Sequence, residues 1–168
     1  MAIAFTDILK ARRRIASCVL KTPMRRSPAL ERVAGVPVLL KCEHHQTTGS
    51  FKLRGATNAV LSLSDDERTR GVVTFSTGNH GRALSHAAIA AGTRAVVCMS
   101  ELVPQNKVDA IRALGADIRI VGRSQDEAER AAGELARVEG LSPVSPMDDA
   151  AVIAGQGTLG MEAVEDAP

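Results

Sequence analysis

From Gly71 onward the sequence alternates short apolar runs with longer segments of helical character. This alternation predicts strands over residues 72–75, 95–99 and 118–121, and helices over the three segments between and after them, 79–91, 104–114 and 124–139. Strands joined by helical crossovers pair in parallel, because a tight turn cannot reach a parallel neighbour. The predicted fold class is therefore α/β with an open parallel sheet.

The pattern before Gly71 is less regular. It predicts a first helix over 6–17 with Ile8, Leu9 and Ile15 on its inner face, and a helix from Ser50 towards Leu61. The remaining predictions are a Pro-bounded loop over 21–28, a buried strand over 38–42 and a capped helical turn from Ser64 to Glu67.

Two glycine- or proline-bearing segments lie near the end of the chain. LSPVSPMDD, around residue 145, is predicted to be a linker. GQGTLG, at 155–160, follows no predicted strand and lacks dinucleotide-binding spacing. We therefore expect a turn and a helix start at 155–160, not a Rossmann fingerprint.

Charge and composition exclude several classes of protein. The 168 residues include three Phe, no Trp and no Tyr, so the stacking aromatics of a nucleic-acid site are missing, and we expect no nucleic-acid partner. Apolar runs are too short to span a membrane, and the N-terminus lacks the charge order of a secretory signal. Three cysteines with no close pairing fit a reducing compartment. A cytoplasmic location without membrane partners is expected.

The charge is unevenly distributed. Residues 1–32 carry eight Lys or Arg and two acidic residues, whereas residues 122–168 carry three Lys or Arg and ten acidic residues. The two ends of the chain are expected to attract each other or a partner.

Lys52 stands in the first turn of a predicted helix, directly after the small-residue turn TTGS. The free N–H groups of a helix N-terminus disfavour a cation, so Lys normally avoids this position. The same field favours the neutral amine, which is the nucleophile that Schiff-base chemistry requires. The alternative is an exposed Lys whose stem lies along the surface.

The loop Ser76-Thr77-Gly78-Asn79-His80 lies between a predicted strand and a predicted helix. Open α/β sheets bind ligands at the carboxyl ends of their strands. Glycine lets the backbone approach an anion, and the helix N-terminus supplies donors, so the loop suits a carboxylate or a phosphate. A plain helix cap with turn glycines is the alternative.

His44 and His45 stand close to Cys42, which raises the possibility of a metal site. Adjacent side chains on a strand point to opposite faces, so the two imidazoles would not bind one ion there. We therefore expect no metal site.

The segments KCEHHQTTGSFKLRGA and FSTGNHGRAL together resemble the fold type II pyridoxal-phosphate enzymes, of the serine/threonine dehydratase family that includes serine racemase. Two long motifs in the right order make the resemblance specific, and it covers nearly the whole chain. Within the family, the chain looks most similar to the hydroxyectoine-utilisation dehydratases. The implied architecture is tryptophan synthase beta-like, with open parallel sheets.

The resemblance implies roles for seven residues. Lys52 would be catalytic and would bind pyridoxal 5'-phosphate covalently, with Phe51 and Asn79 also at the cofactor. Ser76, Thr77, Gly78, Asn79 and His80 would bind the substrate carboxylate. Arg82 stands where many relatives have Gln, and Thr77 stands where serine racemase has a second Ser, so racemase activity does not follow from the resemblance.

The implied activity is α,β-elimination of a β-hydroxy amino acid, as in threonine or serine ammonia-lyases, giving a 2-oxoacid and ammonia. A hydroxyectoine-utilisation dehydratase acting on a related compound is one alternative, and a non-catalytic interaction module is another. An amino-acid substrate is the expected partner, with homo-oligomers at full length.

The resemblance also implies a division of the chain. Residues 1–70 would begin the large domain, 71–148 would form the small domain, and 149–168 would start the return to the large one. The family's glycine-rich phosphate loop is expected beyond residue 168. The 168 residues alone would thus be a truncated, N-terminal half, with weak or no cofactor binding and no activity as the expected result.

Overall fold

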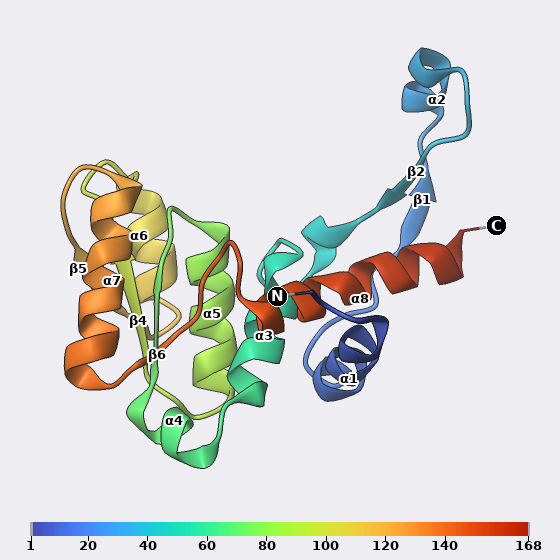
Figure 1. Cartoon of the computed structure of the whole chain (residues 1–168). Helices are drawn as coiled ribbons and strands as arrows, with labels where there is room; N and C mark the ends of the chain where they lie inside the picture. Colours follow the sequence, from blue (N-terminus) through green and yellow to red (C-terminus); the bar gives the residue numbers. More distant parts are fainter. Residues whose placement is uncertain (1, 168) are drawn as a thin grey trace.

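A four-stranded parallel sheet forms one side of the molecule (Figure 1). The structure is a computed structural model that describes residues 2–167. The strand order is β5-β4-β3-β6, and the strands are β3 (Val72–Phe75), β4 (Ala95–Met99), β5 (Asp117–Ile120) and β6 (Ser142–Pro143). The predicted α/β class and parallel pairing are confirmed. The two-residue strand β6 lies in the segment predicted to be a linker, where it pairs with the start of β3.

Helices cover both faces of this sheet, because alternate strand residues point in opposite directions. On one face Val72, Val97 and Met99 pack against α5 (Asn79–Ala90) and α6 (Gln105–Arg112). On the other face Val73, Phe75, Val96 and Cys98 pack against α7 (Gln125–Glu139). Every residue of β3 and β4 is buried, as expected for central strands with helices on both sides.

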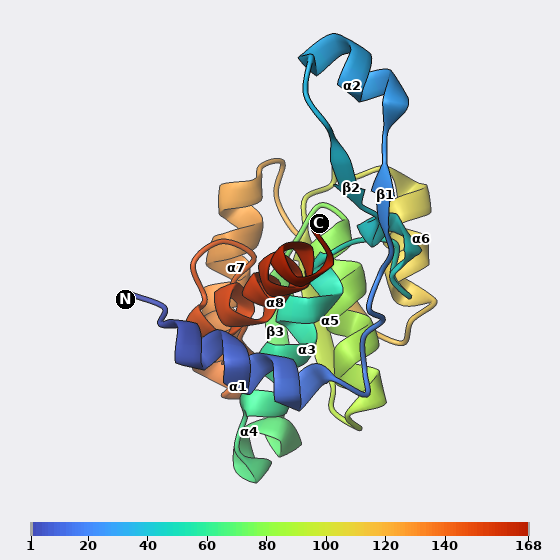
Figure 2. The ribbon, with the colours of Figure 1, turned by 90° about the vertical axis from the view of Figure 1, so that its right-hand side faces the viewer.

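Beside the sheet lies a group of helices made from segments before β3 and from the C-terminal helix. It consists of α1 (Phe5–Ile15), α3 (Lys52–Ser62) and α8 (Ala150–Asp166), and the short α4 (Asp65–Arg70) follows α3 (Figure 2). Ser64 caps α4 through the Ser64–Glu67 capping box that the sequence predicted. In α1, Ile15 is buried as predicted, together with Ala11, whereas Ile8 and Leu9 are only half-buried.

The prediction of a turn at 155–160 is wrong, because α8 runs through this segment without interruption. Its glycines serve close helix packing. A Cβ on Gly155 would lie 2.6 Å from the Arg54 carbonyl oxygen and 2.7 Å from the Gly55 Cα, so α8 and α3 touch backbone to backbone there. A Cβ on Gly157 would meet the Ile8 side chain at 2.7 Å. Gly155 and Gly157 thus let α3 and α1 approach α8.

A hairpin arm projects from the helix group (Figure 1). Its antiparallel strands are β1 (Met24–Arg26) and β2 (Leu39–Lys41), and α2 (Pro28–Ala34) lies between them at the tip. The loop predicted over 21–28 is therefore partly strand, and α2 was not predicted. The strand predicted as buried over 38–42 is shorter, at Leu39–Lys41, and only Cys42, after its end, is buried. Leu39 and Leu40 are 37% and 41% exposed, because no described element covers the two-stranded ribbon.

The opposite charges at the two ends of the chain meet as predicted. Arg12 pairs with Glu165 at 2.5 Å, and Lys21 pairs with Asp166 at 2.7 Å. Both pairs join the N-terminal region to the last turns of α8. Within residues 2–167, no helix has both the length and the apolar character that crossing a membrane would need.

Candidate active site

A cavity of about 490 Å³ opens at the carboxyl edge of the parallel sheet. Its wall comes from the loops that follow β3 and β6, from α5, α6 and α7 near their N-termini, and from the start of α3. This is the edge at which open α/β sheets bind ligands. The lining residues are Lys52, Ser76, Thr77, Gly78, Asn79, His80, Arg82, Asn106, Lys107, Ala110, Gln125, Pro146 and Met147.

Lys52 is the first residue of α3 and is half-buried in the cavity wall. Its Nζ donates a hydrogen bond to the Pro146 carbonyl oxygen at 2.9 Å and lies 5.6 Å from the centroid of the Phe51 ring. Phe51 itself is 42% exposed and is not among the lining residues. The turn before α3 depends on Gly49, whose φ of 76° is left-handed and favours glycine. The predicted placement of Lys52 at a helix N-terminus is confirmed.

The loop from Ser76 to His80 faces the same cavity as Lys52. Ser76 Oγ accepts hydrogen bonds from the backbone N–H groups of Gly78 at 3.1 Å and Gly81 at 2.9 Å, which closes the loop onto the start of α5. Thr77 and Asn79 are exposed. The first turn of a helix has no helical acceptors for its N–H groups, so those of Asn79 and His80 remain available to an anion.

His80 is buried beneath the loop. Its Nε2 lies 3.3 Å from the Val144 carbonyl oxygen, which can only accept, so Nε2 carries the proton. Burial lowers the pKa of His80 to about 4; the bond to Val144 opposes this shift and the Lys52 ammonium adds to it. The imidazole is therefore neutral near pH 7. For His80, the backbone N–H, and not the imidazole, is placed to contact a ligand.

The start of α3 is fixed by Arg54, two residues after Lys52. The Arg54 guanidinium is fully buried and makes two hydrogen bonds each to the carboxylates of Glu43 and Glu162, at 2.7–2.9 Å. Burial alone would lower the pKa of Arg54, but the bonds to Glu43 and Glu162 outweigh burial and raise it. This network ties α3 to α8 and to the segment after β2.

Several lining residues were not predicted. Asn106 and Lys107 lie in the first turn of α6, and Gln125 begins α7. Each follows a strand in the same way that the 76–80 loop follows β3. Since the strands and helix starts were predicted, the rule that ligands bind at carboxyl ends of strands could have found them. Among the described residues, the lining includes the cations Lys52, Arg82 and Lys107 and no Asp or Glu.

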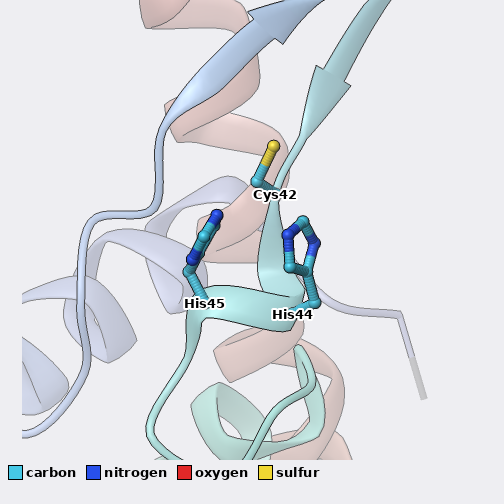
Figure 3. A group of neighbouring side chains, drawn as sticks. All are labelled: Cys42, His44 and His45. Carbon is cyan, nitrogen blue, oxygen red and sulfur yellow. The ribbon is translucent and has the colours of Figure 1, made fainter.

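The structure changes the interpretation of His44 and His45. They lie in a 3-10 turn, η1 (Glu43–His45), and not on a strand. Their ring centroids are 4.2 Å apart, and both rings lie on the side of the turn that faces Cys42 (Figure 3). The expectation that the two imidazoles point to opposite faces is wrong, because β2 ends at Lys41.

Comparisons with known proteins agree with the geometry. A family model described as "Pyridoxal-phosphate dependent enzyme" matches residues 15–168. The "Putative threonine dehydratase" of Sinorhizobium fredii is 55% identical over 99% of this chain and 50% of its own length. The "L-threonine ammonia-lyase" of Thermotoga maritima is 42% identical over 99% of this chain and 41% of its own length.

Solved structures show the same fold. The serine racemase of Dictyostelium discoideum superposes with a TM-score of 0.91 at 37% identity, over 98% of this chain and 54% of that one. The chain spans about half the length of the curated relatives it matches. With a family match from residue 15 onward and relatives of this similarity, the chain belongs to the pyridoxal-phosphate dependent enzymes, in the fold type II group of threonine dehydratases and serine racemases.

Proposed function

We propose that the protein containing this chain is a pyridoxal-phosphate-dependent lyase that eliminates the β-hydroxyl group of an amino acid, in the manner of a threonine or serine ammonia-lyase. One observation carries the proposal: the Lys52 amine and the N-terminus of α5 face one cavity. An amine nucleophile and an anion-binding helix start are the two groups that this chemistry needs on this side of the site. The similarity to threonine dehydratases supports the same reaction class.

The residues present fit the cofactor. The cavity volume lies in the range of small-molecule sites, and Lys52 is half-buried with its Nζ held by a carbonyl oxygen rather than by a carboxylate. In addition, Thr48 Oγ1 and Ser50 Oγ, in the turn before Lys52, are buried without a hydrogen-bond partner among residues 2–167. Phe51 and Asn79 would flank the cofactor, as proposed cofactor-binding residues beside Lys52.

Each residue would have a distinct role. Bound pyridoxal phosphate supplies a carbon that accepts an amine and a ring that takes up electrons from the substrate α-carbon. Lys52 would hold the cofactor and then, as a free amine, remove the α-proton. The N–H groups at the start of α5, within the segment Ser76, Thr77, Gly78, Asn79 and His80, would bind the substrate carboxylate. The β-hydroxyl would leave as water, and the released product would hydrolyse to a 2-oxoacid and ammonia.

The proposal extends to the domains and the substrate. Residues 71–148 would be the small domain, and 1–70 with 149–168 would belong to the large domain. Threonine, serine and a hydroxyectoine-derived compound each carry a hydroxyl group that can be eliminated. Measuring 2-oxoacid and ammonia release from these three by the intact protein would rank them, and its oligomeric state would test the proposed homo-oligomer.

Borohydride trapping tests the role of Lys52 without any need for turnover. The chain has five lysines, at positions 10, 21, 41, 52 and 107. The 168-residue chain is expected to bind the cofactor weakly. It would be incubated with pyridoxal phosphate and reduced with borohydride, and the labelled lysines would be mapped by mass spectrometry. We expect the fastest labelling at Lys52.

Two variants make the trapping experiment decisive. Lys52→Ala removes the proposed site, whereas Lys107→Ala removes another amine that lines the same cavity. Fast labelling should disappear in Lys52→Ala and persist in Lys107→Ala. Equal labelling of all five lysines, or fast labelling that survives in Lys52→Ala, would contradict the proposal.

A further inference from the structure

We propose that Cys42, His44 and His45 form a binding site for one zinc ion. The Cys42 Sγ and one ring nitrogen from each histidine all lie within 4.8 Å of one another. Figure 3 shows the two imidazoles side by side on the 3-10 turn, with the thiol above them on the chain that leads into the turn. We call these three residues the Cys42 cluster. The proposed zinc site does not depend on the proposed lyase function.

The backbone holds the Cys42 cluster in place. The His45 N–H donates to the Cys42 carbonyl oxygen at 3.0 Å, and the Gln46 N–H donates to the Glu43 carbonyl oxygen at 3.1 Å. These two bonds close a tight turn around the histidines. Gln46 is buried and is bonded through its side chain to both backbone groups of Leu20, so the turn is fixed at its far end as well. The ligand-bearing segment is therefore ordered before any ion binds.

The donor set matches the preference of zinc. Thiolate sulfur and imidazole nitrogen are its usual protein ligands, at about 2.3 Å and about 2.0–2.1 Å. Tetrahedral bonds of that length place neighbouring ligand atoms about 3.5 Å apart, so the Cys42 cluster must contract by roughly an ångström. His44 and His45 are exposed and can turn about their side-chain bonds, whereas Cys42 is buried and stays in position. Three protein ligands leave the fourth position to water.

The charged residues next to the Cys42 cluster already have partners. Glu43, between Cys42 and the histidines, is held by Arg54 and by the Thr22 hydroxyl, so it is not a competing ligand. Lys41 precedes Cys42, but its ammonium is paired with Glu162 at 2.8 Å and Asp166 at 3.1 Å. The charge of Lys41 is thus neutralised by two carboxylates of α8. Within the described part of the chain, the side chains of the Cys42 cluster form no ion pair, and the Cys42 thiol makes one weak contact, with the Leu40 carbonyl oxygen at 3.5 Å.

Cobalt(II) titration tests the zinc site directly, because cobalt replaces zinc in such sites and absorbs light. One equivalent of Co²⁺ added to the reduced chain should produce a thiolate-to-cobalt charge-transfer band and the visible bands of tetrahedral cobalt. One equivalent of Zn²⁺ should abolish both, whereas Mg²⁺ should not, since Mg²⁺ takes oxygen ligands. Absence of the charge-transfer band at one equivalent would overturn the proposal.

Matched variants identify the ligands. His44→Ala and His45→Ala each remove an exposed ring, so folding is preserved, and each should weaken cobalt binding by at least the 10- to 100-fold typical of losing an outer-shell contact. Cys42→Ser should lose the charge-transfer band. Cys18→Ser, which removes an exposed thiol outside the cluster, should change nothing. Full binding in either histidine variant, or loss of the band in Cys18→Ser, would contradict the site.

Discussion

Replacing Arg54 by Met should destabilise the fold more than any exposed charge substitution. The Arg54 side chain is 1% exposed, and its partners Glu43 and Glu162 are 10% and 11% exposed. Met fills much of the space of the Arg stem but leaves Glu43 buried without its cation, while Glu162 keeps the Lys41 ammonium at 2.8 Å. Breaking a buried ion pair from one side costs about 3–5 kcal/mol, because the remaining charge has lost both its water and its partner.

The expected loss is a large part of the stability of a folded domain, which is typically about 5–15 kcal/mol. With a urea m-value of about 2 kcal/mol per molar, a loss of about 4 kcal/mol lowers the unfolding midpoint by about 2 M. Urea titration followed by circular dichroism measures this shift. Arg137→Met is the matched control: Arg137 pairs with Glu134 on the surface of α7, and its loss should cost less than about 1 kcal/mol.

A compensating set of substitutions separates charge from packing. If the cost of Arg54→Met comes from carboxylates that have lost the Arg54 cation, adding Glu43→Gln and Glu162→Gln should recover part of the stability, because both changes remove buried charge. If packing dominates, these changes should add further loss. A midpoint for Arg54→Met within about 0.5 M of the wild-type value would refute the reasoning, since it would mean that the two carboxylates find water or new partners at little cost.

Three further predictions follow from contacts at α8 and at the cavity. Gly155→Ala should lower the melting temperature strongly, because the added Cβ would lie 2.6–2.7 Å from backbone atoms of α3. Gly160→Ala, in the same helix, should leave the melting temperature unchanged or raise it, because a Cβ there would have no atom of another element within 4 Å. Ser76→Ala should cost about 1–2 kcal/mol in urea titration, because two backbone N–H groups lose their acceptor. The pKa of His80 is lowered from 6.5 to about 4, so the neutral imidazole stabilises the fold fully above pH 6.5. Up to about 3 kcal/mol of unfolding free energy is lost as the pH falls to 4. The slope of stability against pH in this window should flatten in His80→Gln; an unchanged slope would show that other groups cause it.

The sheet was predictable because its strands are short, apolar and separated by capped helices. β3, β4 and α7 lie within a residue of the predicted ranges, and the Ser124 capping box that marked the start of α7 is present. The hairpin arm was not predictable in the same way. β1 is only three residues long, and its sequence, Met-Arg-Arg, has no apolar alternation. Local pattern identifies a strand only where one face is buried.

The placement of Lys52 was predictable from local sequence, but the groups that fix it were not. A small-residue turn followed by a helix start is a signal within ten residues, and it put Lys52 at the N-terminus of α3. The Arg54–Glu162 pair spans 108 positions in the sequence, and a turn and a helix start were predicted at 155–160, where α8 is continuous. Only the backbone contact of Gly155 with α3 shows why glycine is needed in the middle of that helix.

The cavity lies between the helices that hold Lys52 and the sheet that holds the 76–80 loop. On one side, α3 is held by close backbone contact with α8 and by the buried charges around Arg54, so Lys52 has a fixed base. On the other side, the 76–80 loop is closed by Ser76 and supported by β3. Among residues 2–167, the Lys52 amine donates one hydrogen bond, to the carbonyl oxygen of Pro146, which follows β6 of the sheet. That bond spans the two sides, so a ligand that takes up the amine must replace the contact between Lys52 and Pro146.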